Sequence, residues 1–298
     1  MRWRKKKRVA LALGAGGARG IAHIGVLRAL EEESIPIDCI AGSSFGSIVG
    51  AIYSISMDSR KVERRIKDYI QSPDFKEAME EIGSIENDTS RNFLERIQST
   101  LKRGYFYTRA LRKKSILTPE AFVHNMKRLV GEESFKDMHI PFKCLSVDLI
   151  TGNPIGLDEG DLCLALQASS ATPGFFPPVR LNSMLLVDGG VAEMVPLYLA
   201  RTFKPDYVIG VDVTRDILPI QDPDEEILHS LDIVFRCYDI SRDFMNTYES
   251  REVDCIIRPA IGSYDWTDFE LFDTFVREGY LAARKKIKVL KKDIYWIY

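Results

Sequence analysis

Apolar residues along the first 57 positions form two kinds of run. Residues 8–14 (RVALALG) and 37–42 (IDCIAG) are short, nearly continuous apolar runs that end in glycine, which is typical of strands buried on both faces. Residues 20–33 and 45–57 place their apolar side chains at helical spacing instead. Strand, loop and helix therefore occur twice in succession, and this order predicts a parallel sheet with helices on its faces.

Residues 58–130 change character, because helical patterns follow one another without a strand pattern or a chemical motif. Amphipathic helices are predicted over 59–70, 91–101 and 119–130, with polar connections between them. We therefore expect a helical insertion. It either caps the site or covers one face of the sheet, and the sequence leaves both interpretations open.

Strand patterns resume after the insertion, over 142–152, 184–190 and 207–213. Residues 162–179 predict an apolar helix that runs into a proline-rich loop. The remainder predicts a helix over 225–245, a late strand over 255–260 and a terminal helix over 267–292. Without an internal repeat or a low-complexity linker, one domain over 1–298 is the simplest organisation. It divides into a core over 8–213, the helical insertion over 58–130 and a C-terminal helical extension over 214–298.

Composition narrows the class of protein. Hydrophobic residues make up 45% of the chain, and 41 basic side chains nearly balance 43 acidic ones, so the total charge does not predict a nucleic-acid partner. The five cysteines are scattered without any CxxC spacing, which favours free thiols in a reducing compartment. No stretch has the form of a signal peptide or of a membrane span, which needs about 20 apolar residues. We expect a cytoplasmic protein.

The first eight residues (MRWRKKKR) are strongly basic. The favoured interpretation is a solvated start or a flank of the first strand. The alternative is peripheral contact with anionic lipid at the inner membrane surface, at about 1 kcal/mol for each basic residue.

Residues 42–46 (GSSFG) are the single Gly-x-Ser-x-Gly match in the chain, and they lie between a predicted strand and a predicted helix. On such a sharp turn the side chain of Ser44 projects from the sheet, and crowding of the flanking positions explains Gly42 and Gly46. The helix N-terminus beside Ser44 favours developing negative charge. The alternative, a helix N-cap serine, leaves both glycines unexplained. Ser44 is therefore the predicted nucleophile.

Asp188 is the predicted base. It ends an apolar strand and precedes Gly189 and Gly190, which allow a sharp turn, at the strand end where ligands of open α/β sheets gather. Asp148 and Asp212 follow strand-like runs without such a turn, so we interpret them as structural acids. None of the four histidines stands beside a loop signature; they are His23, His124, His139 and His229.

The first loop, residues 14–20 (GAGGARG), is tested against similar glycine-rich motifs. It lacks the Gly-Lys-Ser/Thr of a phosphate-binding P-loop. It also lacks the acidic residue that a dinucleotide fingerprint places about 20 positions later, because the second strand ends in the serine turn. What remains is a glycine-lined bend whose N–H groups can hold an oxyanion.

Four motifs in this order resemble the patatin-like phospholipase family, and within it the bacterial branch related to the neuropathy target esterase catalytic domain. They are residues 11–30, 40–51, 168–179 and 185–190, and the resemblance covers roughly residues 8–213. It implies an α/β, three-layer patatin-like fold with a mostly parallel central sheet, helices on both faces and a helical insertion. It also implies a Ser44–Asp188 dyad without histidine, in which the aspartate accepts the serine proton and later activates water.

The family's Gly-Gly-Gly-x-Arg-Gly loop falls on residues 15–20, so alanine stands at its first position here. The resemblance implies Gly16 and Gly17 as oxyanion-hole donors, with Ala15 as a further candidate, and gives Arg19 a bracing role without catalysis. The remaining supporting positions are Gly14, Gly20, Gly42, Gly46, Gly189 and Gly190.

The implied function is a serine acyl hydrolase that releases fatty acids from phospholipid or lysophospholipid, with no cofactor, metal or calcium requirement. Phe45, Phe175 and Phe176 either contact the acyl chain or belong to the core. Two alternatives stay open. One is an α/β-hydrolase-type esterase in which His229 completes a Ser44-Asp188-His229 triad. The other is a non-catalytic regulator that binds lipid through the same fold.

Overall fold

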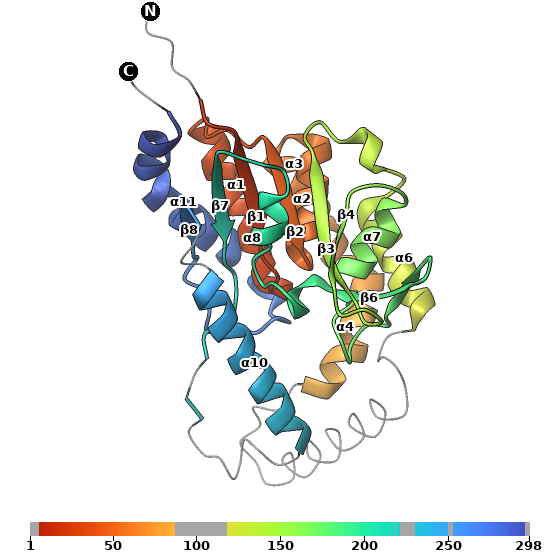
Figure 1. The fold of residues 1–298 in the computed structure, drawn as a ribbon. Helices are drawn as coiled ribbons and strands as arrows, with labels where there is room; N and C mark the ends of the chain where they lie inside the picture. The colour runs from red at the N-terminus through yellow and green to blue at the C-terminus, as the bar shows by residue number, and fades with distance from the viewer. Residues whose placement is uncertain (1–5, 87–117, 218, 221–229, 250–252, 296–298) are drawn as a thin grey trace, which may run out of the picture.

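The computed structural model describes residues 6–86, 118–217, 219–220, 230–249 and 253–295. These residues form a sheet of eight strands in the order β5-β6-β3-β2-β1-β7-β8, with β4 paired to β3 (Figure 1). The strands are β1 (Val9–Leu13), β2 (Cys39–Ser43), β3 (Phe142–Asp148), β4 (Pro154–Leu157), β5 (Val179–Leu181), β6 (Met184–Asp188), β7 (Tyr207–Val211) and β8 (Cys255–Ile257).

The sheet is parallel from β3 through β2, β1 and β7 to β8, whereas β4, β5 and β6 pair antiparallel with their neighbours. Leu13 lies opposite both Gly42 and Val211, so the chain leaves β1, β2 and β7 at the same edge of the sheet. The glycine-rich loop and the serine turn therefore meet at that edge.

The direction of β6 differs from the prediction, in which Asp188 lies where parallel strands end. β6 runs antiparallel to β3, and its last residue, Asp188, pairs with Ser146, two positions before the end of β3. The aspartate thus approaches the serine from the opposite direction. β6 also runs antiparallel to β5, because the two strands are joined by a tight connection in which Asn182 adopts a positive φ of 54°.

Large and small residues alternate along β1, and they point to opposite faces of the sheet. Leu11 and Leu13 point into the main core, with the helices α1 (Ala22–Glu32), α2 (Phe45–Ser56) and α11 (Phe272–Ile294). Ala10 and Ala12 point the other way and pack against the short helix α8 (Leu197–Arg201). The predicted arrangement of helices on both faces is confirmed.

The insertion forms three described helices: α3 (Ser59–Ile70), α4 (Pro73–Glu86) and α6 (Pro119–Val130). α3 begins where the side chain of Asp58 accepts the N–H groups of Arg60 and Lys61, and α6 begins where Thr118 accepts the N–H of Ala121. The helix predicted over 91–101 lies outside the described residues. α3 packs on α1 and α2, and α6 packs on α7 (Leu162–Ser169).

Two elements after residue 213, β8 and α11, pack on the core of the fold. β8 extends the sheet, and α11 packs closely along α1, since a Cβ atom on Gly279 would lie 1.9 Å from the Ala22 carbonyl oxygen. α10 (Ser230–Glu249) lies beyond the body of the sheet, below it in Figure 1. The short 3-10 turns are η1 (Gly17–Ile21), η2 (Phe135–Asp137), η3 (Gly189–Val191) and η5 (Phe269–Leu271).

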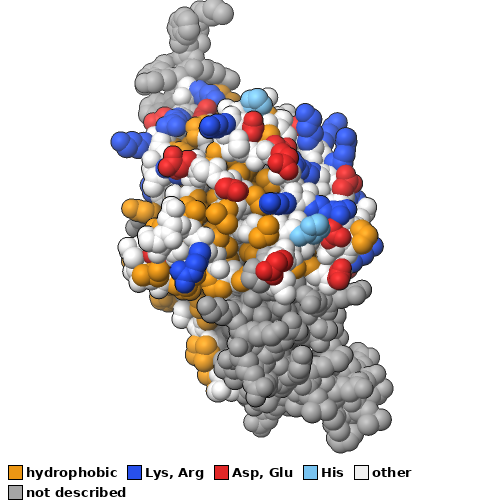
Figure 2. Space-filling view, turned by 90° about the vertical axis from the view of Figure 1, so that its right-hand side faces the viewer, with side chains coloured by type: hydrophobic (Ala, Val, Ile, Leu, Met, Phe, Trp, Pro, Cys, Tyr) orange, Lys and Arg blue, Asp and Glu red, His pale blue; other side chains and the backbone are white. Residues whose placement is uncertain are grey.

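The five cysteines are free, and Cys237 alone among them is exposed. None of the helices in the described ranges combines the length and hydrophobicity that a bilayer span requires. Acidic and basic side chains are interspersed over the face on which α6 and α7 lie (Figure 2), in keeping with the near balance of charge in the sequence.

Candidate active site

Ser44 occupies the turn between β2 and α2 with φ 52° and ψ −126°, a strained conformation for a residue with a side chain. A Cβ atom on Gly42 would lie 2.4 Å from the Cα of Ser47, and one on Gly46 would lie 2.3 Å from the Leu13 carbonyl oxygen. Both flanking positions therefore require glycine. Gly46 does so because the turn presses against the end of β1, a contact that the sequence does not reveal.

Ser44 is the serine of this turn that faces the cavity. Ser43 donates its hydroxyl to the Glu193 carbonyl oxygen at 3.3 Å, and Ser47 donates its own to the Ser44 carbonyl oxygen at 2.6 Å. Ser44 occupies the N-cap position of α2, but its side chain makes no capping hydrogen bond. Its hydroxyl is thus not used as a cap, and the N-cap alternative loses its basis.

Asp188 is 5% exposed, and hydrogen bonds hold both of its carboxylate oxygens. The Thr172 hydroxyl donates to Oδ2 at 2.9 Å, and the Gly190 N–H donates to Oδ1 at 2.7 Å. The Ser44 side chain lines the same cavity, and it is one of the groups that lower the pKa of the Asp188 carboxylate. The predicted nucleophile and the predicted base are therefore brought together.

Burial raises the pKa of Asp188 above its ordinary value, because the ionised carboxylate loses its solvation. The Ser44 side chain, the hydrogen bonds from Gly190 and Thr172 and the positive charge of Arg242 favour the ionised form, and they offset part of this effect. The carboxylate is thus a stronger base than an exposed aspartate, while still being supported as an anion.

The described histidines lie away from this pair. His23 is fully buried and hydrogen-bonds the Gly14 carbonyl oxygen through Nε2 at 2.8 Å. His124 is exposed beside Asp74, and His139 is also exposed. None of these three lines the cavity at Ser44. His229, the third member of the alternative triad, lies outside the described residues.

Asp148 and Asp212 have their own partners away from Ser44. Asp148 accepts the Thr151 hydroxyl at 2.8 Å and the Leu185 N–H at 3.0 Å. Asp212 accepts the Thr214 hydroxyl at 2.7 Å, and it also forms an ion pair with Arg258. Both carboxylates therefore fix turns at strand ends.

The loop after β1 forms part of the cavity wall. Ala15 donates its N–H to the Met194 carbonyl oxygen at 2.7 Å, and Ala18 donates its own to the Trp266 carbonyl oxygen at 2.8 Å. Gly16 and Gly17 lie between them and line the cavity, and the structure gives their N–H groups no acceptor among the described residues. Of the three candidate donors, the Ala15 N–H is thus already engaged.

Arg19 connects this loop to two other segments of the chain through hydrogen bonds. It is 6% exposed, and it donates Nε to the Val213 carbonyl oxygen at 3.1 Å and Nη1 to the Tyr264 carbonyl oxygen at 2.8 Å. Burial lowers its pKa to about 10. The other motif glycines stand where a Cβ atom would meet a neighbour at close range: Gly14 at Val211, Gly20 at Phe45, Gly189 at Leu145 and Gly190 at Ala15 and Asp188.

A cavity of about 710 Å³ opens above the serine and the aspartate. Phe45, Phe175 and Phe176 all line it. The insertion contributes further apolar walls, so it borders the site. These side chains are Tyr69 from α3, Phe75, Ala78 and Met79 from α4, and Phe122, Met126 and Leu129 from α6.

Three residues that contact Ser44 or Asp188, or line the cavity beside them, were not predicted from the sequence. Ser169 accepts the Ser44 N–H at 3.2 Å, Thr172 binds Asp188, and Arg242 lines the cavity from α10. Thr172 falls within the motif at 168–179, whose hydroxyl-rich start was the available signal. No such signal existed for Arg242, because its nearness to Asp188 arises from the tertiary fold.

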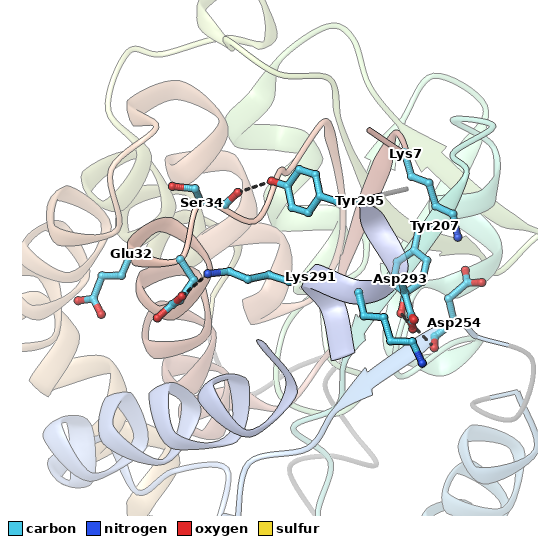
Figure 3. A pocket seen from close by; sticks show the side chains of 10 residues that line it. Lys7, Glu32, Ser34, Tyr207, Asp254, Lys291, Asp293 and Tyr295 are labelled. Atoms are coloured by element: carbon cyan, nitrogen blue, oxygen red, sulfur yellow. Dashed lines mark hydrogen bonds and ion pairs between the residues drawn. The ribbon is translucent and has the colours of Figure 1, made fainter. Parts of the chain in front are cut away.

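A second pocket of about 990 Å³ lies at the opposite end of the sheet, where β7 begins (Figure 3). Its polar groups bind one another: Tyr295 donates its hydroxyl to the Ser34 carbonyl oxygen at 2.8 Å, and Tyr207 donates its own to Asp293 at 3.2 Å. It brings no serine hydroxyl to a buried carboxylate. Within the described ranges no cluster of His, Cys, Asp and Glu has the arrangement of a metal site.

Comparison with known proteins bears on the same residues. A family model described as patatin-like phospholipase matches residues 11–201, which include the glycine loop, Ser44 and Asp188. Over 207 residues the chain is 29% identical to patatin-like phospholipase domain-containing protein 6 of Mus musculus, covering 69% of this chain and 13% of that protein.

Two microbial relatives extend the comparison. An uncharacterised NTE family protein of Mycobacterium bovis is 30% identical over 206 residues, covering 69% of this chain and 49% of that protein. The lysophospholipase NTE1 of Meyerozyma guilliermondii is 27% identical over 297 residues, covering 92% of this chain and 19% of that protein. The chain thus spans half or less of the length of each of these relatives.

Proposed function

The chain belongs to the patatin-like phospholipase family, and from this premise we propose that it hydrolyses fatty-acyl esters of lipids through Ser44 and Asp188. The observation that supports the proposal is that the two side chains lie near one another in the lining of one apolar cavity. One is a serine on a strained turn, and the other is a buried carboxylate of raised pKa.

In the first step, the Ser44 hydroxyl attacks the ester carbonyl carbon while the Asp188 carboxylate accepts its proton. Collapse of the tetrahedral intermediate breaks the bond to the leaving alkoxide, which takes the proton from Asp188 and departs as an alcohol. Water then attacks the acyl-enzyme, and Asp188 accepts the proton that water loses. Collapse of the second intermediate returns that proton to Ser44 and frees the fatty acid.

A dyad without histidine suits esters, because an alkoxide leaves more readily than an amine and needs less help from a general acid. Gly16 and Gly17 line the cavity, and their N–H groups have no acceptor among the described residues, so we assign them to the oxyanion of each intermediate. The N-terminus of α2 adds a favourable dipole at Ser44.

Apolar walls from α4 and α6 fit a fatty-acyl chain, which gains from leaving water. The substrate class we propose is phospholipid or lysophospholipid, and one relative of this chain is named a lysophospholipase. Contact of the basic start of the chain with anionic lipid stays a prediction, since residues 1–5 lie outside the described part.

The test is fatty-acid release from phospholipid and from lysophospholipid by the purified protein, beside Ser44→Ala and Asp188→Asn. We expect release by the wild type and at least a 1000-fold loss in each variant. Release that persists in Ser44→Ala would remove the serine from its role. Tight lipid binding without turnover of any ester would favour the regulatory alternative.

A further variant separates the dyad from the triad. Under the dyad, His229→Gln keeps fatty-acid release near the wild-type rate, because Asp188 alone accepts the proton. Under the triad, the same substitution removes the general base and lowers kcat to the level of Ser44→Ala.

A further inference from the structure

Three arginines line the cavity, and they differ in what their donors meet. Arg19 binds two backbone carbonyl oxygens, at 3.1 and 2.8 Å. Arg215 faces the carboxylate of Asp265 at 3.6 Å. Both therefore have strong oxygen acceptors or an opposite charge beside them.

Arg242, on α10, has weaker partners. Its Nε lies 3.1 Å from the sulfur of Met194, and its Nη2 contacts the same sulfur. A thioether is a weak acceptor, whereas a guanidinium carries five N–H donors. The Asp239 carboxylate lies 3.9 Å away, at the limit of an ion pair, and the Tyr238 ring lies 4.8 Å from the guanidinium carbon. Among the described residues, Arg242 is thus the cavity arginine whose hydrogen bonds go only to sulfur, and its ion pair is longer than that of Arg215, at 3.9 Å against 3.6 Å.

Arg242 is also close to the proposed chemistry. A Cβ atom built on Gly190 would lie 3.4 Å from Nη2 of Arg242 and 3.1 Å from Oδ1 of Asp188. The positive charge acts on the Asp188 carboxylate, whose pKa it lowers. The guanidinium therefore lies beside the dyad, on the side of the cavity formed by α10.

We propose that Arg242 is an anion subsite that binds the phosphodiester of a glycerophospholipid while its acyl ester lies at Ser44. This rests on the proposed function and adds the group that selects phospholipids over neutral glycerides. A guanidinium presents paired donors that match two oxygens of a phosphate. The short glycerol linker between ester and phosphate fits an anion site placed beside the dyad rather than on it.

Two substrates with the same acyl ester test the subsite: palmitoyl lysophosphatidylcholine, which has the phosphodiester, and monopalmitoylglycerol, which lacks it. Both are presented in the same neutral detergent micelles. We expect Arg242→Gln to lower the ratio of kcat/KM for the first to that for the second about 10- to 100-fold, the loss of a charge-assisted hydrogen bond. Arg242→Lys keeps the charge but loses the paired geometry, so it should restore part of the ratio. Arg236→Gln, on the same helix but outside the cavity lining, is the matched control.

An equal loss on both substrates would overturn the subsite, since Arg242 would then act through the Asp188 carboxylate alone. An unchanged ratio in Arg242→Gln would overturn it as well. The assays are run at a pH above the acid limb of the wild-type profile, so that a changed pKa of Asp188 does not imitate a binding effect.

A binding measurement separates this proposal from the proposed function. Dodecylphosphocholine carries the phosphodiester but has no acyl ester. Dodecylglycerol carries neither a phosphodiester nor an acyl ester. In the Ser44→Ala background, calorimetry should show the first ligand losing at least tenfold in affinity on Arg242→Gln, with the second changed far less. This result supports the subsite even if no ester is turned over. Affinity for inorganic phosphate without affinity for dodecylphosphocholine would overturn the lipid assignment.

Discussion

The Thr172 hydroxyl donates a hydrogen bond of 2.9 Å to Oδ2 of Asp188. The backbone repeats the connection, because the Asp188 N–H donates to the Ala171 carbonyl oxygen at 3.0 Å. The loop after α7 is thereby tied to the end of β6 by a side chain and by the main chain. The carboxylate consequently has one orientation toward Ser44, although the surrounding sheet is antiparallel at this point.

Thr172→Val removes this donor and keeps the shape of the side chain. Because the hydroxyl lowers the pKa of Asp188, its loss raises that pKa further, and a larger fraction of the base is protonated at any acidic pH. We expect the acid limb of kcat/KM against pH to move to higher pH. Thr172→Ser, which keeps the hydroxyl, should restore the wild-type profile. A limb that stays in place in Thr172→Val would show that the hydroxyl does not act on the base.

Gly46→Ala tests the contact between the serine turn and β1. The added Cβ would lie 2.3 Å from the Leu13 carbonyl oxygen and 2.6 Å from that of Gly14, and backbone atoms cannot move aside without separating β1 from the turn. We expect a loss of about 1–3 kcal/mol in the free energy of unfolding and at least a 100-fold loss in kcat, measured by denaturant titration and fatty-acid release. Gly152→Ala is the control. Its Cβ meets nothing within 4 Å, so it carries only the cost of a positive φ.

The parts of the site that the sequence predicts are those whose chemistry is encoded locally. A turn with a strained central serine needs glycine at fixed spacing, so Gly42, Ser44 and Gly46 can be recognised within five residues. The Asp-Gly-Gly turn is equally local, and its aspartate is found beside Ser44. The apolar runs likewise predict the strands, because burial on both faces leaves a continuous signal.

What escaped prediction depends on distant segments. The apolar run at 184–190 does not reveal the direction of its strand. The Asn-Ser connection before it indicates a hairpin, which the prediction did not include. Arg242 reaches the cavity from a helix 54 residues beyond Asp188 in the sequence, and no spacing rule relates the two. The close packing of Gly279 on α1 also had no local sign, although it makes the final helix part of the core.

Gly16→Ala tests the proposed oxyanion hole, with Ala15→Gly as its control. A Cβ atom on Gly16 would lie 2.7 Å from Cγ2 of Val213 and 2.9 Å from the Val213 carbonyl oxygen, so the loop must shift and its N–H must turn away. We expect kcat to fall about 100- to 1000-fold, as when one oxyanion donor is lost. Ala15→Gly should lose much less, because it adds no atoms and leaves the backbone N–H groups of the loop in place. A kcat near the wild-type value in Gly16→Ala would contradict the assignment of this loop as the oxyanion hole.

His23 should make the stability of the fold depend on pH. It is fully buried, its Nδ1 has no partner, and burial lowers its pKa to about 4 from the ordinary 6.5. Between these values the unfolded chain binds more protons than the folded one, so stability rises with pH across that window. The contribution of His23 is complete above pH 6.5 and is lost as the pH falls toward 4, by about 3 kcal/mol in total. Denaturant titrations from pH 4 to 7 should show a steeper slope for the wild type than for His23→Gln, whose amide can still donate to the Gly14 carbonyl oxygen but does not titrate. Equal slopes for His23→Gln and the wild type would contradict the assignment.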